Sequence, residues 1–392
     1  MDSFLSRRGF VIFLAAVVIM VLLLPAELSG GETNLTPVLP QPQKNEGILS
    51  RLMENKFPVG VKYYGKIDAE VIRELKETNV NVVFCNPTTQ GRQLLRENDI
   101  AFFLNVSVFH APDEVAKDKT LLATDEKGSA EPLDTWQKIV CPTRKEFRTN
   151  KIKQIIEEVK KLSPDGVSLD FIRFPVYWEM VKPEQTLLQM RKFCFCRRCL
   201  GQFYNQMQIS IPQSLTETSE QAGWILKNHR QDWEQWKCGV ITSMVKQIRD
   251  KVRRIKPDIL IDIHAVPWRL EDFDGGIKLV VGQDFKQLAP YVDVFSPMCY
   301  HHMLWRKPEW IHSVVAEISE LTQKSVWPCI QVKQCYRQAL LSQAEYKKAI
   351  LEALKPPSGG MSVFHWGYLK EDEDKRSIFK SLTLTKRYQD KT

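Results

Sequence analysis

Eight short apolar runs alternate with longer amphipathic stretches from residue 57 onward, and this alternation constrains the fold more than any other feature. Such alternation is typical of parallel βα units. The predicted strands are Val59–Tyr64, Val80–Cys85, Ala101–Phe109, Gly166–Phe171, Ile259–Ala265, Val292–Tyr300, Val326–Val332 and Gly360–Trp366. Between them, helices are predicted at Ala69–Thr78, Lys145–Leu162, Trp233–Ile255, Pro308–Thr322 and Gln343–Leu354. Eight units in succession predict a closed (β/α)8 TIM barrel over 57–392. A doubly wound open sheet would usually have a Gly-rich first turn, and this sequence has none.

Side chains that face into a barrel near the carboxyl ends of its strands meet the substrate. The alternation along the strands predicts that these side chains face inward: Ser168, Asp170, Asp262, His264, Ser296, Met298 and Tyr300. In the eighth strand it places Ser362, Phe364 and Trp366 on one face. The fourth strand ends in a charged residue that is followed closely by a second charged residue. The carboxyl end of this strand is therefore the candidate site.

Asp170 ends the fourth predicted strand, and Arg173 follows three residues later. Hydrolysis of a sugar passes through an oxocarbenium-like state, so a carboxylate at this edge can stabilise or attack the anomeric carbon. Arg173 can keep that carboxylate ionised by lowering its pKa. The alternative is a structural Asp–Arg pair that ties down the loop after the strand.

The segment Asp165–Pro175 resembles the DGIxLDxIRYP segment of bacterial glycosidase families related to the family-10-like glycosyl hydrolases. Val140–Thr143, Ser296–His301 and Phe364–Gly367 resemble further segments of the same group. The resemblance covers about residues 57 to 370 and implies a TIM-barrel glycosidase, without specifying a substrate.

A second carboxylate is needed for hydrolysis. The chitinase pattern fails, because Ser168 and Ile172 stand where that pattern has Asp and Glu. The remaining resemblance, to the amylase-like arrangement, implies a nucleophilic Asp on strand four and a proton donor after strand five. Glu271 and Asp272 are the candidate donors, and an acidic surface loop is the alternative.

Further polar and aromatic side chains near the carboxyl ends of the strands are candidates for substrate binding. They are Arg173, Asp262, His264, Tyr300, His301 and Trp366. A histidine in a strand, or an inward tryptophan, is equally a core residue in many barrels.

Three cysteines lie within six residues, at Cys194, Cys196 and Cys199, in a predicted insertion at 176–232 after strand four. This spacing suits one structural metal ion such as zinc, with a fourth ligand from Cys238, Cys141 or His229. A disulfide and inert thiols are the alternatives. The predicted chemistry of hydrolysis itself requires no cofactor.

The first residues have a different character from the rest. Arg7 and Arg8 precede an uncharged apolar run at Gly9–Ala26, which predicts a targeting segment over residues 1–29. A membrane anchor, a cleaved signal peptide and a twin-arginine export signal are the alternatives. All three predict that the body of the chain lies outside the cytoplasm and meets the membrane only through this segment, with 30–56 as a linker.

The net charge of +8 is spread among interleaved acids and bases, which argues against a nucleic-acid groove. The predicted function is therefore hydrolysis of a polysaccharide or oligosaccharide. A catalytically inactive, glycan-binding barrel at the cell envelope is the alternative. A second carboxylate about 5 to 10 Å from Asp170 would distinguish the two.

Overall fold

The computed structural model describes residues 57–389. The predicted targeting segment (1–29) and linker (30–56) lie outside this range. Within it, no helix combines the length and the apolar character needed to cross a membrane.

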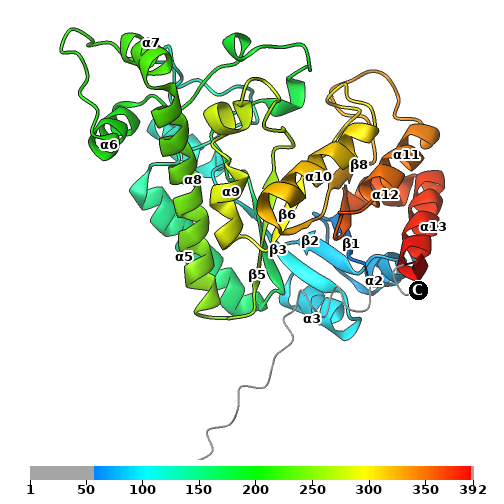
Figure 1. Ribbon diagram of the computed structural model, residues 1–392. Coiled ribbons are helices and arrows are strands. Elements are labelled where there is room, and N and C mark those ends of the chain that lie inside the picture. The colour runs from blue at the N-terminus through cyan, green and yellow to red at the C-terminus, as the bar shows by residue number, and fades with distance from the viewer. Residues whose placement is uncertain (1–56, 390–392) are drawn as a thin grey trace, which may run out of the picture. The chain divides into compact units, whose positions relative to one another are not determined.

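Nine parallel strands form one sheet that curls into a near barrel (Figure 1). They are β1 (Val59–Lys62), β2 (Val82–Cys85), β3 (Ala101–Ser107), β4 (Gly166–Asp170), β5 (Leu260–Ala265), β6 (Val294–Pro297), β7 (Ser325–Val326), β8 (Cys329–Gln331) and β9 (Met361–Phe364). Their order is β7-β6-β5-β4-β3-β2-β1-β9-β8. Each strand from β2 to β7 therefore pairs with the one before it in the chain, and β1 also pairs with β9, as a TIM-barrel-like fold requires.

The single run predicted at Val326–Val332 is divided into β7 and β8 at Trp327 and Pro328. Proline has no backbone N–H to donate to a neighbouring strand, which explains a break at this position. The two pieces pair with opposite edges of the sheet, β7 with β6 and β8 with β9. A parallel bridge between Met298 and Cys329 links the end of β6 to β8.

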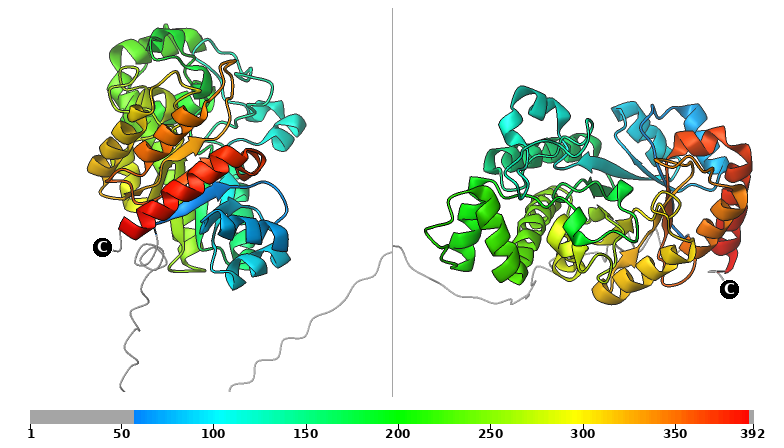
Figure 2. Two further views of the ribbon diagram at one scale, coloured as in Figure 1. Left: turned by 90° about the vertical axis from the view of Figure 1, so that its right-hand side faces the viewer. Right: turned by 90° about the horizontal axis from the view of Figure 1, so that it is seen from above.

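Helices surround the sheet, as the view from above shows (Figure 2). The main ones are α2 (Ala69–Glu77), α3 (Thr89–Glu97), α5 (Lys145–Leu162), α8 (Arg230–Arg253), α10 (Glu309–Thr322), α11 (Gln343–Ala353) and α13 (Glu373–Gln389). The predicted helix at Lys145–Leu162 has the observed bounds. Asp68 caps α2 as its side chain accepts a hydrogen bond from the Val71 backbone N–H at 3.1 Å.

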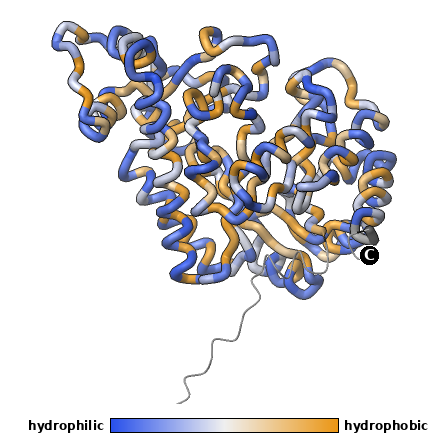
Figure 3. The backbone as a smooth tube through the Cα atoms, in the orientation of Figure 1, coloured by the Kyte–Doolittle hydropathy of each residue, from blue (hydrophilic) through white to orange (hydrophobic). Residues whose placement is uncertain are grey.

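Apolar side chains fill two separate spaces. A small cluster fills the interior of the sheet and consists of Val82, Phe84, Phe103, Leu260, Val294 and Trp327. A larger cluster lies between the sheet and the helices. Figure 3 shows this pattern as apolar strands enclosed by helices whose outer faces are hydrophilic. The interior cluster closes the lower part of the barrel, so a cavity is possible only at the carboxyl ends.

The chain between β4 and α8 contains two short helices, η2 (Trp178–Met180) and η3 (Leu187–Gln189), followed by α6 (Arg197–Met207) and α7 (Thr218–Asn228). The helices α6 and α7 pack on α8 (Figure 1). This segment covers part of the carboxyl-end face, and its first residues line the cavity described next.

Candidate active site

A cavity of about 430 Å³ lies at the carboxyl ends of the strands. Its volume is within the range of small-ligand sites in proteins. Most of its wall is aromatic or sulfur-containing, and four ionisable groups of opposite charge face one another in it. The lining residues are Lys62, Tyr64, Trp136, Asp170, Phe171, Arg173, Trp178, Glu179, Met298, Tyr300, Met303, Gln331, Cys335, Tyr336, Phe364 and Tyr368.

Asp170, the last residue of β4, forms an ion pair with Lys62, the last residue of β1. The Lys62 Nζ lies 2.6 Å from Asp170 Oδ2, and the Lys62 side chain is only 1% exposed. The Phe171 backbone N–H donates a hydrogen bond of 2.8 Å to the other carboxylate oxygen. Burial alone would raise the pKa of Asp170, but the charges of Lys62, His264 and Arg173 outweigh it and hold the pKa well below its usual range. Asp170 is therefore an ionised carboxylate at neutral pH.

Glu179 lies in η2, nine residues after Asp170 in the chain, and has the opposite character. Its side chain is 10% exposed. Burial raises the pKa of Glu179 to about 7, although Arg173 acts in the lowering direction. Gln137 Nε2 is 3.5 Å from one of its oxygens. A carboxyl group with this pKa is partly protonated at neutral pH and can donate a proton.

Arg173 lies between the two carboxyl groups. Its Nη1 is 3.9 Å from Asp170 Oδ1, and its Nη2 is 3.9 Å from Glu179 Oε1. Since both groups approach one planar guanidinium, they lie within about 10 Å of each other. This upper bound includes the separations of about 5 to 9.5 Å between the two acids that hydrolysis of glycosides uses. The cavity thus holds one carboxylate kept charged and one carboxyl group that is partly protonated at neutral pH, a combination that assigns separate roles to the two acids.

Two predicted substrate-binding residues, Arg173 and Tyr300, line the cavity. Two others, Asp262 and His264, face inward as predicted but lie beneath the cavity, and both are fully buried. Asp262 accepts hydrogen bonds of 2.6 Å from the hydroxyls of Ser168 and Ser296. His264 Nδ1 lies 2.7 Å from Ser168 Oγ. Asp262 and His264 therefore belong to an internal polar network and not to the cavity wall.

The remaining predicted residues lie elsewhere. His301 is buried and contacts Glu345 at 3.1 Å. Trp366 is fully buried at the start of α12 (Trp366–Glu371), after β9 has ended at Phe364. Neither residue lines the cavity. Phe364, which the alternation placed on the same face as Trp366, is the aromatic residue of this strand that does.

The predicted proton donors Glu271 and Asp272 also lie outside the cavity wall. Glu271 is 69% exposed and pairs with Arg269 at 2.6 Å. Asp272 is buried, but its Oδ1 is 3.0 Å from Arg306 Nη2 and its Oδ2 accepts from the Arg269 backbone N–H. Both carboxylates, which lie in the loop after β5, therefore form ion pairs with arginine side chains.

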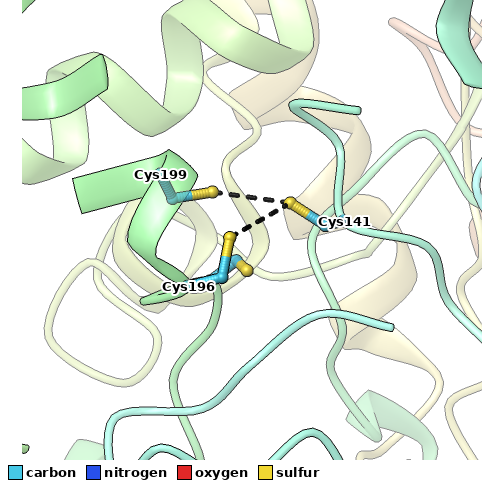
Figure 4. A group of neighbouring side chains, drawn as sticks. Cys141, Cys196 and Cys199 are labelled. Carbon is cyan, nitrogen blue, oxygen red and sulfur yellow. Dashed lines mark hydrogen bonds between the residues drawn. The ribbon is translucent and has the colours of Figure 1, made fainter. Parts of the chain in front are cut away.

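Cys141, before α5, lies against Cys196 and Cys199 at the start of α6 (Figure 4), and Cys194 completes a compact cluster of four cysteines. The Sγ atoms of Cys141, Cys194, Cys196 and Cys199 lie within 4.8 Å of one another. Cys141 supplies the fourth ligand position, one of the three residues considered for it. All nine cysteines of the chain lie in its described part and are free thiols, so no disulfide forms there. Four thiolates at this spacing suit a tetrahedral site, and the cluster can hold a metal such as zinc.

Several solved structures of similar fold are glycoside hydrolase domains or β-galactosidases. The match to the glycoside hydrolase domain of PgaB (BpsB) from Bordetella bronchiseptica has a TM-score of 0.63 at 10% identity, and covers 83% of this chain and 98% of that one. The match to the β-galactosidase of Marinomonas ef1 has a TM-score of 0.62 at 10% identity and covers 83% and 59%. The match to a catalytic mutant of Gan42B, a GH42 β-galactosidase from G. stearothermophilus, has a TM-score of 0.61 at 11% identity and covers 85% and 57%. At these identities the likeness shows the fold alone, and this chain spans less than two thirds of either β-galactosidase.

None of the curated protein sequences matches the chain. The family described as "Putative glycosyl hydrolase domain" matches residues 61–331, which is more than half of the chain and extends from within β1 to the end of β8. The chain therefore belongs to this glycosyl hydrolase domain family.

Proposed function

We propose that this chain hydrolyses an O-glycosidic bond of a polysaccharide or oligosaccharide, with Asp170 as the ionised carboxylate and Glu179 as the general acid. The observation that carries the proposal is the pairing of two buried carboxyl groups of opposite pKa displacement on one cavity. Asp170 would attack the anomeric carbon or stabilise its positive charge. Glu179 would protonate the leaving oxygen.

Lys62 and Arg173 have distinct parts in this mechanism. Lys62 keeps Asp170 charged and holds one of its oxygens, while the Phe171 backbone N–H holds the other, so the orientation of the carboxylate at the cavity is fixed. Arg173 is near both acids and orients them relative to each other. The aromatic lining provides flat apolar surfaces on which the faces of sugar rings can stack.

Substitution of each carboxyl group tests the assignment. On a panel of oligosaccharides, Asp170→Asn and Glu179→Gln should each reduce kcat/KM by about 100-fold or more. Glycosides with a 2,4-dinitrophenyl leaving group need no protonation, so Glu179→Gln should retain activity toward these substrates whereas Asp170→Asn should not.

Glu271→Gln and Asp272→Asn are the matched controls, because they neutralise the carboxylates that the amylase-like arrangement would use. Both should leave hydrolysis within about twofold of the wild type, since their partners are Arg269 and Arg306 and not the cavity. Loss of activity in either control, with Glu179→Gln unaffected, would transfer the acid role to the β5 loop. Binding of glycans without hydrolysis by the wild type would favour the inactive, glycan-binding barrel instead.

We also propose that the four-cysteine cluster binds a structural zinc ion and takes no part in the chemistry. Four clustered thiols, three of them buried, support this proposal. Three of the four cysteines follow Glu179 in the segment between β4 and α8. A closed set of four cysteine ligands leaves no coordination position for substrate.

The targeting segment predicted at residues 1–29 leads us to propose an extracytoplasmic location for the barrel. Expression of the full chain with a reporter fused to its carboxyl end, followed by protease accessibility on intact cells, tests it. Protection of the reporter in intact cells would contradict the proposal.

A further inference from the structure

Arg173 has hydrogen-bonding capacity that the protein does not use. Its side chain is 1% exposed and lines the cavity. Within the described part of the chain, its Nε and Nη1 have no hydrogen-bond acceptor. Its nearest carboxylate oxygens are 3.9 Å away, which is beyond hydrogen-bond distance. A buried donor without an acceptor is costly, so these positions suit the oxygen atoms of a ligand.

The charges of the groups that line the cavity point in the same direction. The ionisable groups with opposite charges that line it are Lys62, Arg173, Asp170 and Glu179. Lys62 and Asp170 neutralise each other at 2.6 Å. When Glu179 is protonated, as the proposed general acid must be, Arg173 has no full countercharge of its own. The working form of the cavity therefore has an excess positive charge, and a buried unpaired cation is unfavourable.

We propose that the substrate has an anionic group on the sugar bound in this cavity, and that Arg173 binds this group. A uronic acid carboxylate and a sulfate ester both present adjacent anionic oxygens to a guanidinium fork. The inference rests on the proposed glycosidase function, which it deepens by naming the substrate class. An anionic group beside Glu179 also favours the protonated acid, so substrate binding and proton donation support each other.

Matched pairs of substrates test the inference on the wild-type protein. The panel consists of oligogalacturonides, glucuronan oligosaccharides and chondroitin oligosaccharides, each beside its carboxyl-reduced counterpart. A further pair is a sulfated and a desulfated chondroitin oligosaccharide. The preferred anionic substrate should exceed its neutral counterpart in kcat/KM by about 10- to 100-fold, the range of a hydrogen-bonded charge. The pair with the larger ratio identifies the carboxylate or the sulfate as the group recognised.

Substitution of Arg173 separates binding from positioning. Arg173→Lys retains the charge but loses the planar fork, so KM for the anionic substrate should rise more than kcat falls. The discrimination between anionic and neutral partners should decrease in the same variant. Arg96→Lys, on the exposed face of α3, is the control and should retain the full discrimination. Calorimetric titration of the catalytically impaired Glu179→Gln variant with the same oligosaccharides measures binding without turnover.

The outcomes distinguish this inference from the proposed function. Hydrolysis of neutral oligosaccharides as fast as their anionic partners overturns the inference and leaves the glycosidase function intact. Binding of anionic oligosaccharides that is weakened in Arg173→Lys, with no hydrolysis of any substrate, supports the inference and contradicts the glycosidase function. Equal binding of charged and neutral partners, or binding of neither, overturns the inference.

Discussion

The Lys62 ammonium lies 2.6 Å from the Asp170 carboxylate although the two residues are 108 positions apart in the chain. Both side chains are almost completely buried. The last residues of β1 and β4 thus meet across the barrel, at the wall of the cavity. Breaking such a pair leaves one charge uncompensated, which is more costly than the pair is favourable.

Lys62→Met should therefore destabilise the protein by about 3 to 5 kcal/mol at pH 7, measured by urea unfolding. The pKa of Asp170 lies below its unfolded value, so its contribution to stability is present at neutral pH and is lost as the pH falls through the acid range. The variant and the wild type should accordingly become more similar in stability at low pH. Lys66→Met, at an exposed position after β1, should change the free energy of unfolding by about 0.5 kcal/mol or less. A small loss in Lys62→Met that does not depend on pH would contradict the role given to the pair.

Glu179 should produce the opposite pH dependence. Its pKa is raised from 4.5 to about 7, so the folded protein retains a proton that the unfolded chain has released. The stability that this proton provides is complete below the unfolded pKa and is lost as the pH rises toward 7 and above. Between pH 5 and 8, the free energy of unfolding of wild type should fall by about 2 to 3 kcal/mol relative to Glu179→Gln. Glu157→Gln, exposed on α5, should run parallel to the wild type over the whole range.

The network beneath the cavity allows a comparison of two buried serines. Ser168 has one hydroxyl proton and gives it to Asp262, so it must accept its 2.7 Å hydrogen bond from a protonated His264 Nδ1. Ser168→Ala would remove both of these hydrogen bonds and leave Asp262 with Ser296 and His264 as its partners, and it should cost about 1 to 3 kcal/mol. Ser362 is equally buried, but its hydroxyl is paired with the thiol of Cys329, a weak hydrogen-bonding group, so Ser362→Ala should cost less than Ser168→Ala. Equal losses in both variants, by chemical denaturation, would show that side-chain volume and not hydrogen bonding determines the effect.

The cysteine cluster predicts a measurable metal content. The purified protein should contain about one equivalent of zinc by elemental analysis, and Cys196→Ser should contain much less. The same variant should lose about 3 kcal/mol of stability, because metal bound only by the folded state stabilises it. Cys335→Ser, a cysteine outside the cluster, should keep its metal. A metal-free wild type of unchanged stability after treatment with a chelator would rule out the structural zinc.

The sequence predicted the fold more completely than the site. Alternating strands and helices, and the inward direction of Asp262 and His264, follow from local periodicity, which side-chain burial enforces. The division of the seventh predicted strand at Pro328 could not be predicted from this periodicity, because the apolar run continues on both sides of the proline. The role of Asp170 could be predicted because the carboxyl ends of all strands in a barrel lie at the same face.

Glu179 could not be predicted in this way because it lies in an irregular segment after Pro175, where no periodicity indicates which side chains are buried. The only local indication is its position next to Tyr177 and Trp178. Lys62 had a clearer signal, since a lysine at the end of a buried strand requires an anionic partner. Which carboxylate provides that partner depends on the closure of the sheet, a property that no short stretch of sequence contains.

The order of residues along the chain gives the cysteine cluster a consequence beyond its own stability. Cys141 and Cys194 bracket a segment that contains α5, β4 and all three of Asp170, Arg173 and Glu179. With the proposed metal ion bound, the cluster would close the chain into a ring, and the two acids and the arginine between them would lie on that ring. Of the four charged side chains that line the cavity, only Lys62 lies outside this segment of the chain, on β1. Opening the ring would therefore disturb the spacing of the two acids while the barrel, and with it the contact between Lys62 and Asp170, remained assembled.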